Sequence, residues 1–280
     1  MPVSTPSSPV PPMPQLFNTG APTPTPLPNS QRPATAENVD SKIREMHKRD
    51  LDFALPKIRL EVRDLCHPGS NDFLSSVSPG TSMEFAVRRV LDLLYLDPKC
   101  PTTTVPGTRS VTLILRSMGG VAYTTSMDLD DDHKEIHFNI DYINGIDKSR
   151  KADEILGVLV HEMVHCYQHN AFGTCPMGLI EGIADWVRLN CNLSPPHWKK
   201  ETSGKWDAGY QHTGYFLDYL ERRYGNGTIS RMNEKLRTNK YEEKAFWTGL
   251  FGQLVEQLWA DYQESVEVKE TTQITEDRKE

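Results

Sequence analysis

The chain has 280 residues, a formal net charge of −7 at pH 7 and a sequence pI near 5.7. This length allows one sizeable domain with tails. The acidic balance argues against nucleic acid or an anionic membrane surface as the main partner, and no apolar run approaches the roughly 20 residues that a membrane-spanning helix needs.

The first segment is rich in proline. Residues 1 to 37 hold 11 of the 20 prolines, separated mainly by Ser, Thr and Asn. Such a composition cannot bury a core, so residues 1–56 are expected to form a disordered tail and linker. A Pro-rich ligand for a partner protein is the alternative to a plain solvated tail. The N-terminus shows no charged region followed by an apolar stretch, which predicts a cytoplasmic protein.

Alternating and helical patterns then predict a mixed N-terminal half. Apolar residues alternate over 57–63, 111–115 and 135–142, which predicts three strands. Between the first two strands, the capping-box sequence Thr81-Ser-Met-Glu84 predicts the start of a helix. The acidic run over 127–133 is expected to be a solvated turn, and a calcium site is the alternative, although EF-hand spacing is absent.

The segment 151–170 carries a helical apolar stripe and the run His161-Glu-Met-Val-His165. Ser149 is the expected N-cap of this helix. Residues four apart stack on one helix face, so the two imidazoles can share one metal ion. Glu162 lies about 100° round the helix from His161, where it can take a proton from metal-activated water. The alternative is a helix with two histidines and no metal, because this short motif also arises by chance.

A second helix is predicted over 177–189, after a loop that ends in Pro176. Glu181 and Asp185 lie four residues apart on its inward face, where unpaired carboxylates are costly to bury. A cation bound by the histidines removes that cost. We therefore expect Glu181 to be the third ligand and Asp185 to accept the outer ring N–H of a ligand histidine, first of all His161. The alternatives are a solvated acidic face, or Asp185 as the third ligand.

Two imidazoles and a carboxylate, with a fourth position open to water, favour Zn²⁺. Gly182 is expected to let the two ligand helices approach closely, because it has no side chain. The five cysteines match no zinc-finger or redox spacing. We expect reduced thiols, with a Cys166–Cys175 bridge as the alternative in an oxidising compartment.

The remaining chain is predicted to be helical over about 208–224, 229–236 and 246–259. Residues 263–280 are expected to form a polar C-terminal tail that frays. Strands first and helices after give an α+β chain, with a small mixed N-terminal sheet, an active-site helix and a helical C-terminal half.

The Glu-x-x-x-Asp pair after His-Glu-x-x-His resembles thermolysin and its gluzincin relatives, where these residues are the third ligand and its outer partner. A longer resemblance, to the basic secretory protein family, runs in order from about residue 57 to residue 262. The segments that carry it are Val111-Thr-Leu113, Met118-Gly-Gly-Val-Ala-Tyr-Thr124, His161-Glu-Met-Val-His165, Gly178-Leu-Ile-Glu-Gly-Ile-Ala-Asp-Trp-Val-Arg-Leu189, Trp206-Asp-Ala-Gly-Tyr-Gln-His-Thr213, Phe216-Leu-Asp-Tyr219 and Gln257-Leu-Trp-Ala-Asp-Tyr262.

The members of that family are regarded as zinc peptidases of plants, fungi and bacteria. The resemblance implies a zincin-like peptidase domain over 57–262, with secretion as the alternative to a cytoplasmic location. It also implies that the strand over 135–142 lines the cleft and pairs with extended substrate.

Together these residues predict a zinc-dependent metallopeptidase that hydrolyses a peptide or protein with zinc-activated water and Glu162 as general base. The oxyanion needs a second donor besides zinc, for which Tyr210, His212 and Tyr215 are candidates. Tyr210 is favoured because Gly214-Tyr-Phe-Leu-Asp-Tyr-Leu220 resembles the helix after the catalytic tyrosine of large zinc aminopeptidases. His212 is the runner-up, and core packing is the alternative role for Tyr210.

Two other functions fit the same residues. One is a non-catalytic zinc-binding or interaction protein with a zincin fold. The other is a zinc hydrolase of non-peptide substrates, because the chemistry of the site does not specify the amide bond.

Overall fold

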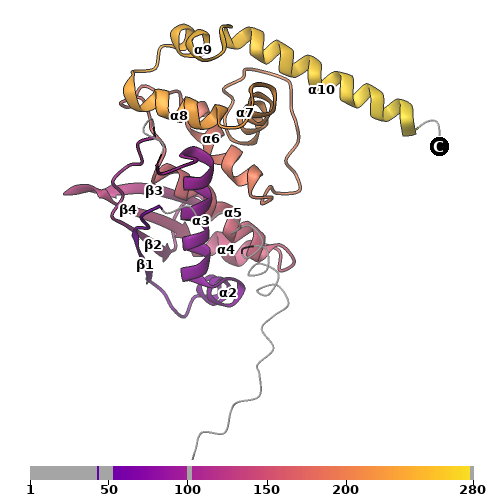
Figure 1. Ribbon diagram of the computed structural model, residues 1–280. Coiled ribbons are helices and arrows are strands. Elements are labelled where there is room, and N and C mark those ends of the chain that lie inside the picture. Colours follow the sequence, from indigo (N-terminus) through magenta and orange to yellow (C-terminus); the bar gives the residue numbers. More distant parts are fainter. Residues whose placement is uncertain (1–42, 44–52, 100–102, 278–280) are drawn as a thin grey trace, which may run out of the picture. The chain divides into compact units, whose positions relative to one another are not determined.

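The computed structural model describes Ile43, residues 53–99 and residues 103–277, with side chains described as far as residue 268. Of the predicted tail and linker over 1–56, only Ile43 and residues 53–56 belong to the described part, and Cys100 lies outside it. The described residues form a small sheet and a set of helices, so the chain is α+β as predicted (Figure 1). None of the described helices is long and apolar enough to cross a membrane.

The sheet has four strands in the order β1-β2-β4-β3. Their bounds in that order are Lys57–Val62, Ser110–Arg116, Asp130–Asn139 and Ala122–Met127. β1, β2 and β4 are parallel, and β3 runs antiparallel to β4 at one edge. Alternate residues of the central strands are fully buried, namely Val111, Leu113, Leu115, Ile136 and Phe138. The sheet therefore packs one apolar face into the core.

The edge of this sheet differs from the prediction. The strand expected to line the cleft, over 135–142, is not an edge strand, because β4 pairs with β2 on one side and with β3 on the other. The chain then turns directly into α4 (Ile140–Gly145). The edge next to the candidate site belongs to β3, which was not predicted because its sequence AYTTSM offers few apolar residues.

Helices pack against the sheet, and the chain then continues without further described strands. α2 (Pro68–Ser76), α3 (Pro79–Leu94), α4 and α5 (Lys151–His165) belong to the mixed half. The helical half comprises α6 (Met177–Asn190), α7 (Tyr210–Tyr224), α8 (Thr228–Thr238), α9 (Glu243–Phe251) and α10 (Val255–Asp277). α6 packs against both α5 and α7 and so joins the two halves (Figure 1).

Two helix starts differ from the expected caps. α3 begins two residues before the predicted capping box, because Ser78 is its N-cap and Pro79 occupies the first helical position, where a missing N–H costs nothing. The N-cap of α5 is Arg150, whereas the expected cap Ser149 bonds to Asp147 instead.

The C-terminal helices also differ in extent. The single helix predicted over 246–259 is divided by Gly252, whose φ of 72° ends α9 in the left-handed region. The segment from residue 263 was expected to fray, but it continues α10 as a helix through Asp277. Tyr262 and Val266 are buried, which explains why the first turns of this segment stay helical.

Candidate metal centre and active-site pocket

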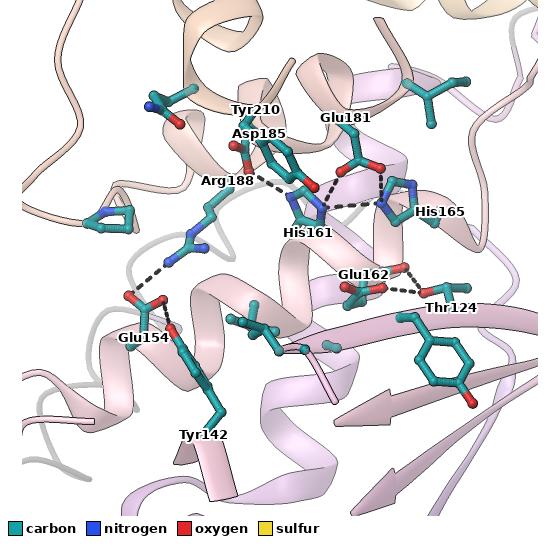
Figure 2. A pocket seen from close by; sticks show the side chains of 18 of the residues that line it. Thr124, Tyr142, Glu154, His161, Glu162, His165, Glu181, Asp185, Arg188 and Tyr210 are labelled. Atoms are coloured by element: carbon teal, nitrogen blue, oxygen red, sulfur yellow. Dashed lines mark hydrogen bonds and ion pairs between the residues drawn. The ribbon is translucent and has the colours of Figure 1, made fainter. Parts of the chain in front are cut away.

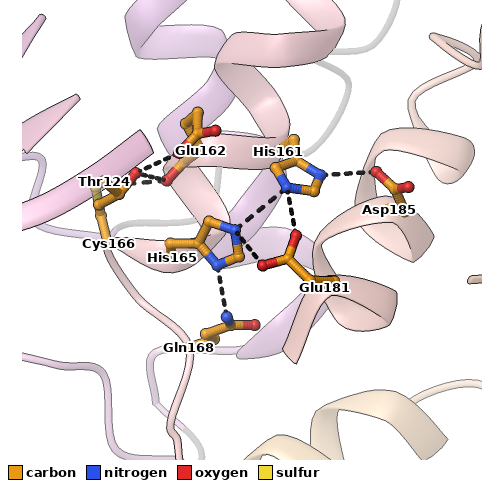
Figure 3. Close-up of polar contacts among 8 residues, drawn as sticks. All are labelled: Thr124, His161, Glu162, His165, Cys166, Gln168, Glu181 and Asp185. Carbon is orange, nitrogen blue, oxygen red and sulfur yellow. Dashed lines mark hydrogen bonds and ion pairs between the residues drawn. The ribbon is translucent and has the colours of Figure 1, made fainter. Parts of the chain in front are cut away.

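Three side chains from two helices converge on one point (Figure 3). His161 and His165 project from consecutive turns of α5, with their Nε2 atoms 3.2 Å apart. Glu181 on α6 places Oε2 3.1 Å from the first Nε2 and Oε1 3.8 Å from the second. One ligand atom of each residue lies within 4.8 Å of the other two, a spacing that a single metal ion can bridge. The structure therefore brings together all three predicted ligands.

The outer nitrogen of each histidine has its own partner. His161 Nδ1 lies 2.7 Å from Oδ1 of Asp185, the buried carboxylate predicted for this role. His165 Nδ1 lies 2.7 Å from the side-chain amide of Gln168, whose Oε1 is buried without a hydrogen-bond partner among the described residues.

A 180° rotation of the Gln168 amide exchanges its oxygen and its NH2 group, so that Oε1 lies beside Nδ1 of His165. It allows Oε1 to accept the Nδ1–H of His165, which leaves the Nε2 lone pair free. In the same way, Asp185 can accept the Nδ1–H of His161 and leave its Nε2 lone pair free. Both imidazoles can then present an unprotonated Nε2 to the shared point, so the donor set fits a divalent metal ion.

The carboxylates beside His161 favour a positive charge at this point. Burial alone lowers the pKa of His161, but hydrogen bonds to Asp185 and Glu181 outweigh it and raise the pKa to about 10. Burial and the neighbouring His161 lower the pKa of His165 to about 4. Burial opposes ionisation of Glu181, but its bond to His161 lowers the pKa overall. A proton on His161 and a metal ion are alternative ways to compensate the same carboxylates, so a metal ion bound here would take the place of that proton.

The close approach of α5 and α6 depends on a glycine, but not on the one that was predicted. Gly182 was expected to bring the two ligand helices together, and this is wrong, because Gly182 faces α7. A Cβ at Gly182 would lie 2.3 Å from Cγ2 of Thr213. The close approach of α5 to α6 occurs at Gly157, where a Cβ would lie 2.6 Å from Nε of Arg188.

Glu162 lies beside the three ligands and is 6 % exposed. The hydroxyl of Thr124, on the edge strand β3, lies 2.8 Å from Oε2 of Glu162 and 2.9 Å from its carbonyl oxygen (Figure 3). Burial raises the pKa of Glu162, and the charge of His161 and the Thr124 hydrogen bond oppose this rise. Sequence reasoning assigned Thr124 no role. Thr124 ends the segment 118–124, which is one of the segments that carry the family resemblance. That position was the signal in the sequence that could have pointed to Thr124.

Tyr210 begins α7 in a strained conformation. Its φ of 47° lies in the left-handed region, which is uncommon for a non-glycine residue and concentrates at functional sites. The ring is nearly parallel to His161, with 13° between the planes and 6.4 Å between the centroids (Figure 2). The negative charge of Glu181 raises the pKa of Tyr210, so the hydroxyl stays protonated and can donate a hydrogen bond.

The other two candidate donors lie elsewhere. His212 is buried, with Nε2 3.0 Å from the carbonyl oxygen of Lys205 and its ring against Trp259. Tyr215 packs edge-on against Trp198. Neither lines the cavity that contains the ligands, so Tyr210 is the one of the three that reaches it.

The site opens into a cavity of about 700 Å³ (Figure 2). Residues 120–124 at the sheet edge, α5 and α6 line it, and Val121, Val158 and Ile180 supply apolar wall. The cavity continues beyond the ligands toward the start of α5, where Glu154 and Arg188 lie.

Residues 55–262 match the family described as peptidase of plants and bacteria, abbreviated BSP. This match covers most of the chain, so the chain belongs to that family, and the resemblance to the basic secretory protein family is confirmed. Membership gives a peptidase kind of function, with protein as the substrate class. No curated protein and no solved structure matches the chain.

Proposed function

We propose that the chain is a zinc-dependent metallopeptidase with a zincin-like domain over residues 57–262. The observation that carries the proposal is the convergence of His161, His165 and Glu181 in the same cavity as Glu162. Two imidazoles and one carboxylate are the ligand set of many catalytic zinc sites, which keep a fourth position open. Family membership supports the peptidase reaction.

The residues would divide the reaction among them. When bound, zinc supplies Lewis acidity, which polarises the scissile carbonyl and lowers the pKa of water toward about 7. Glu162 takes the proton of the attacking water and later delivers it to the leaving amine. The hydroxyl of Tyr210 donates a hydrogen bond to the oxyanion that forms on the carbonyl. Asp185 holds His161 in the tautomer that leaves Nε2 unprotonated.

The sheet edge supplies a place for the peptide backbone. β3 pairs with β4 alone among the described strands, and residues 120–124 line the cavity. An extended peptide can add to such an edge through main-chain hydrogen bonds while its side chains occupy pockets on alternate sides. The role expected of residues 135–142 therefore passes to β3 in this proposal.

The test is Glu162→Gln, assayed with a library of quenched fluorescent peptides. We expect the variant to keep its zinc and to lose turnover, because the change removes the base and no ligand. Glu84→Gln, on α3 and outside the cavity, is the matched control and should retain full turnover. Unchanged turnover in folded, zinc-loaded Glu162→Gln would contradict the mechanism.

The same assay separates the other two functions. If the wild type binds zinc but cleaves no substrate, the chain is a binding protein with this fold. A wild type that cleaves esters or other non-peptide bonds and leaves the peptide library intact is a zinc hydrolase of a different substrate class.

A further inference from the structure

The far end of the cavity is polar and contains none of the three ligands. Tyr142, Glu154, Arg188, His197 and Trp198 line it (Figure 2 labels the first three). Glu154 precedes the first ligand histidine by seven residues on α5, which places it about 10 Å away along the helix axis. That distance is the length of about three residues of extended peptide, so a bound substrate can reach both places.

Arg188 is held in a fixed position at this end. Its Nε lies 3.0 Å from the carbonyl oxygen of Leu193, and its guanidinium carbon lies 5.3 Å from the ring centre of Trp198. On the opposite side, the absence of a Cβ at Gly157 makes room for the guanidinium group. The side chain is only 8 % exposed. The guanidinium group of Arg188 is therefore pre-organised, so the side chain loses little conformational entropy when it binds a ligand.

At the polar end, the donors of Arg188 are not all used in hydrogen bonds to the described residues. Glu154 accepts a hydrogen bond of 3.0 Å from the Tyr142 hydroxyl and pairs with Nη2 of Arg188 at 3.0 Å and of Arg150 at 3.7 Å. Both Nη2 atoms are nevertheless buried without a hydrogen-bond partner among the described residues. Among the described residues that line the cavity, Arg188 is the one arginine or lysine, and Glu154 is the carboxylate with which it pairs.

We propose that this end of the cavity is a subsite for a carboxylate group of the substrate. The carboxylate is either an acidic side chain or the C-terminal carboxylate of the peptide, and Arg188 binds it beside Tyr142 and Trp198. Arginine suits this role because its planar fork matches a carboxylate. The inference rests on the proposed peptidase function. If Arg188 and Glu154 only tie α5 to α6, the enzyme has no preference for acidic substrates.

The experiment compares substrates that differ by one charge. Peptide pairs carry Glu or Gln at each position around the scissile bond, and a second set carries a free or an amidated C-terminus. We expect wild type to favour the carboxylate member by about tenfold or more in kcat/KM at one position. A preference in the first set identifies a side chain, and a preference in the second set identifies the C-terminus.

Variants of Arg188 test whether this residue causes the preference for the carboxylate substrate. Arg188→Met should bring the ratio close to one, and Arg188→Lys should reduce it in part, because it keeps the charge and loses the fork. Arg89→Met is the matched control. It removes another largely buried arginine–carboxylate pair, with Asp92, outside the cavity, so it should leave the ratio unchanged. Circular dichroism and zinc content confirm that each variant is folded.

Binding separates failure of this inference from failure of the proposed function. Zinc-loaded Glu162→Gln, which should not turn over, is titrated calorimetrically with the same peptide pairs. Equal affinity for acid and amide overturns the subsite, whether or not wild type cleaves peptides. An undiminished ratio in folded Arg188→Met, or in Arg188→Lys if the methionine variant does not fold, overturns the role of Arg188.

Discussion

Thr124→Val tests whether the edge strand holds the general base in position. Valine keeps the shape of threonine on β3 and removes the hydroxyl that lies 2.8 Å from Oε2 of Glu162. The hydroxyl has one proton, so it can donate either to this carboxylate or to the carbonyl oxygen 2.9 Å away. Among the described residues, Thr124 is the one side chain that donates a hydrogen bond to the Glu162 carboxylate.

The expected loss follows from that geometry. A hydrogen bond to a charged group contributes about 1.5–3 kcal/mol. If the variant loses this stabilisation in the transition state, kcat falls by about 10- to 100-fold, since each 1.36 kcal/mol is a factor of ten. KM should change little, because Thr124 acts here through Glu162. Zinc content should not change, because no ligand is altered.

The assay is steady-state peptide cleavage, with kcat and KM resolved and metal measured on the same samples. Thr124→Ser should recover most of the activity because it restores the hydroxyl. Thr125→Val is the control, since this neighbour is exposed and, within the described part of the chain, its hydroxyl bonds only to the Ser126 carbonyl, at 3.3 Å. A folded, zinc-loaded Thr124→Val with unchanged kcat would refute the reasoning.

Three further changes have defined outcomes. Tyr210→Phe should retain zinc and reduce kcat by about 10²- to 10³-fold, the usual cost of one oxyanion donor; a change in KM alone would argue for simple packing. Asp185→Asn should weaken zinc affinity by about 10- to 100-fold in a chelator competition, because it loses the charge that orients a ligand histidine; unchanged affinity would remove Asp185 from the site. Gly178→Ala should lower the melting temperature and the zinc content, because its Cβ would lie 1.9 Å from the backbone oxygen of Asp207, and overpacking costs about 1–3 kcal/mol. Gly80→Ala, where a Cβ would meet nothing within 4 Å, should melt like wild type.

The parts of the site that sequence could predict are those set by helix geometry. The i, i+4 spacing of His161 and His165 fixes them on one face whatever surrounds the helix. Glu181 and Asp185 could be placed opposite them because two acidic residues on an apolar helix face need a cation or a donor. In the structure both carboxylates lie beside His161, with Asp185 at Nδ1 and Glu181 at Nε2.

The parts that could not be predicted depend on contacts between distant segments. Thr124 contacts Glu162 because β3 pairs with β4 as an antiparallel hairpin. The sequence of β3 lacks the alternation of apolar residues that predicts a strand. Gly157 and Arg188 meet across two helices, a contact that leaves no local pattern. Nε2 of His212 hydrogen-bonds to the carbonyl oxygen of Lys205, which the loop before α7 places beside it.

The strands predicted over 57–63 and 111–115 were correct in position, whereas the one predicted over 135–142 begins earlier and ends at Asn139, before α4. The order of the strands in the sheet was not available from the pattern. Alternation shows which residues face the core and does not show which strand lies at an edge. Residues 135–142 were therefore assigned the substrate-lining edge that β3 occupies.

The central claim is that His161, His165 and Glu181 bind one zinc ion. Its most direct test is the metal content of purified wild type and of Glu181→Ala by mass spectrometry, after expression with added zinc. We predict about one zinc per wild-type chain, most of it lost in Glu181→Ala and retained in the control Glu84→Ala. A folded, zinc-supplemented wild type without zinc would contradict it and leave the His-Glu-x-x-His run with a structural role.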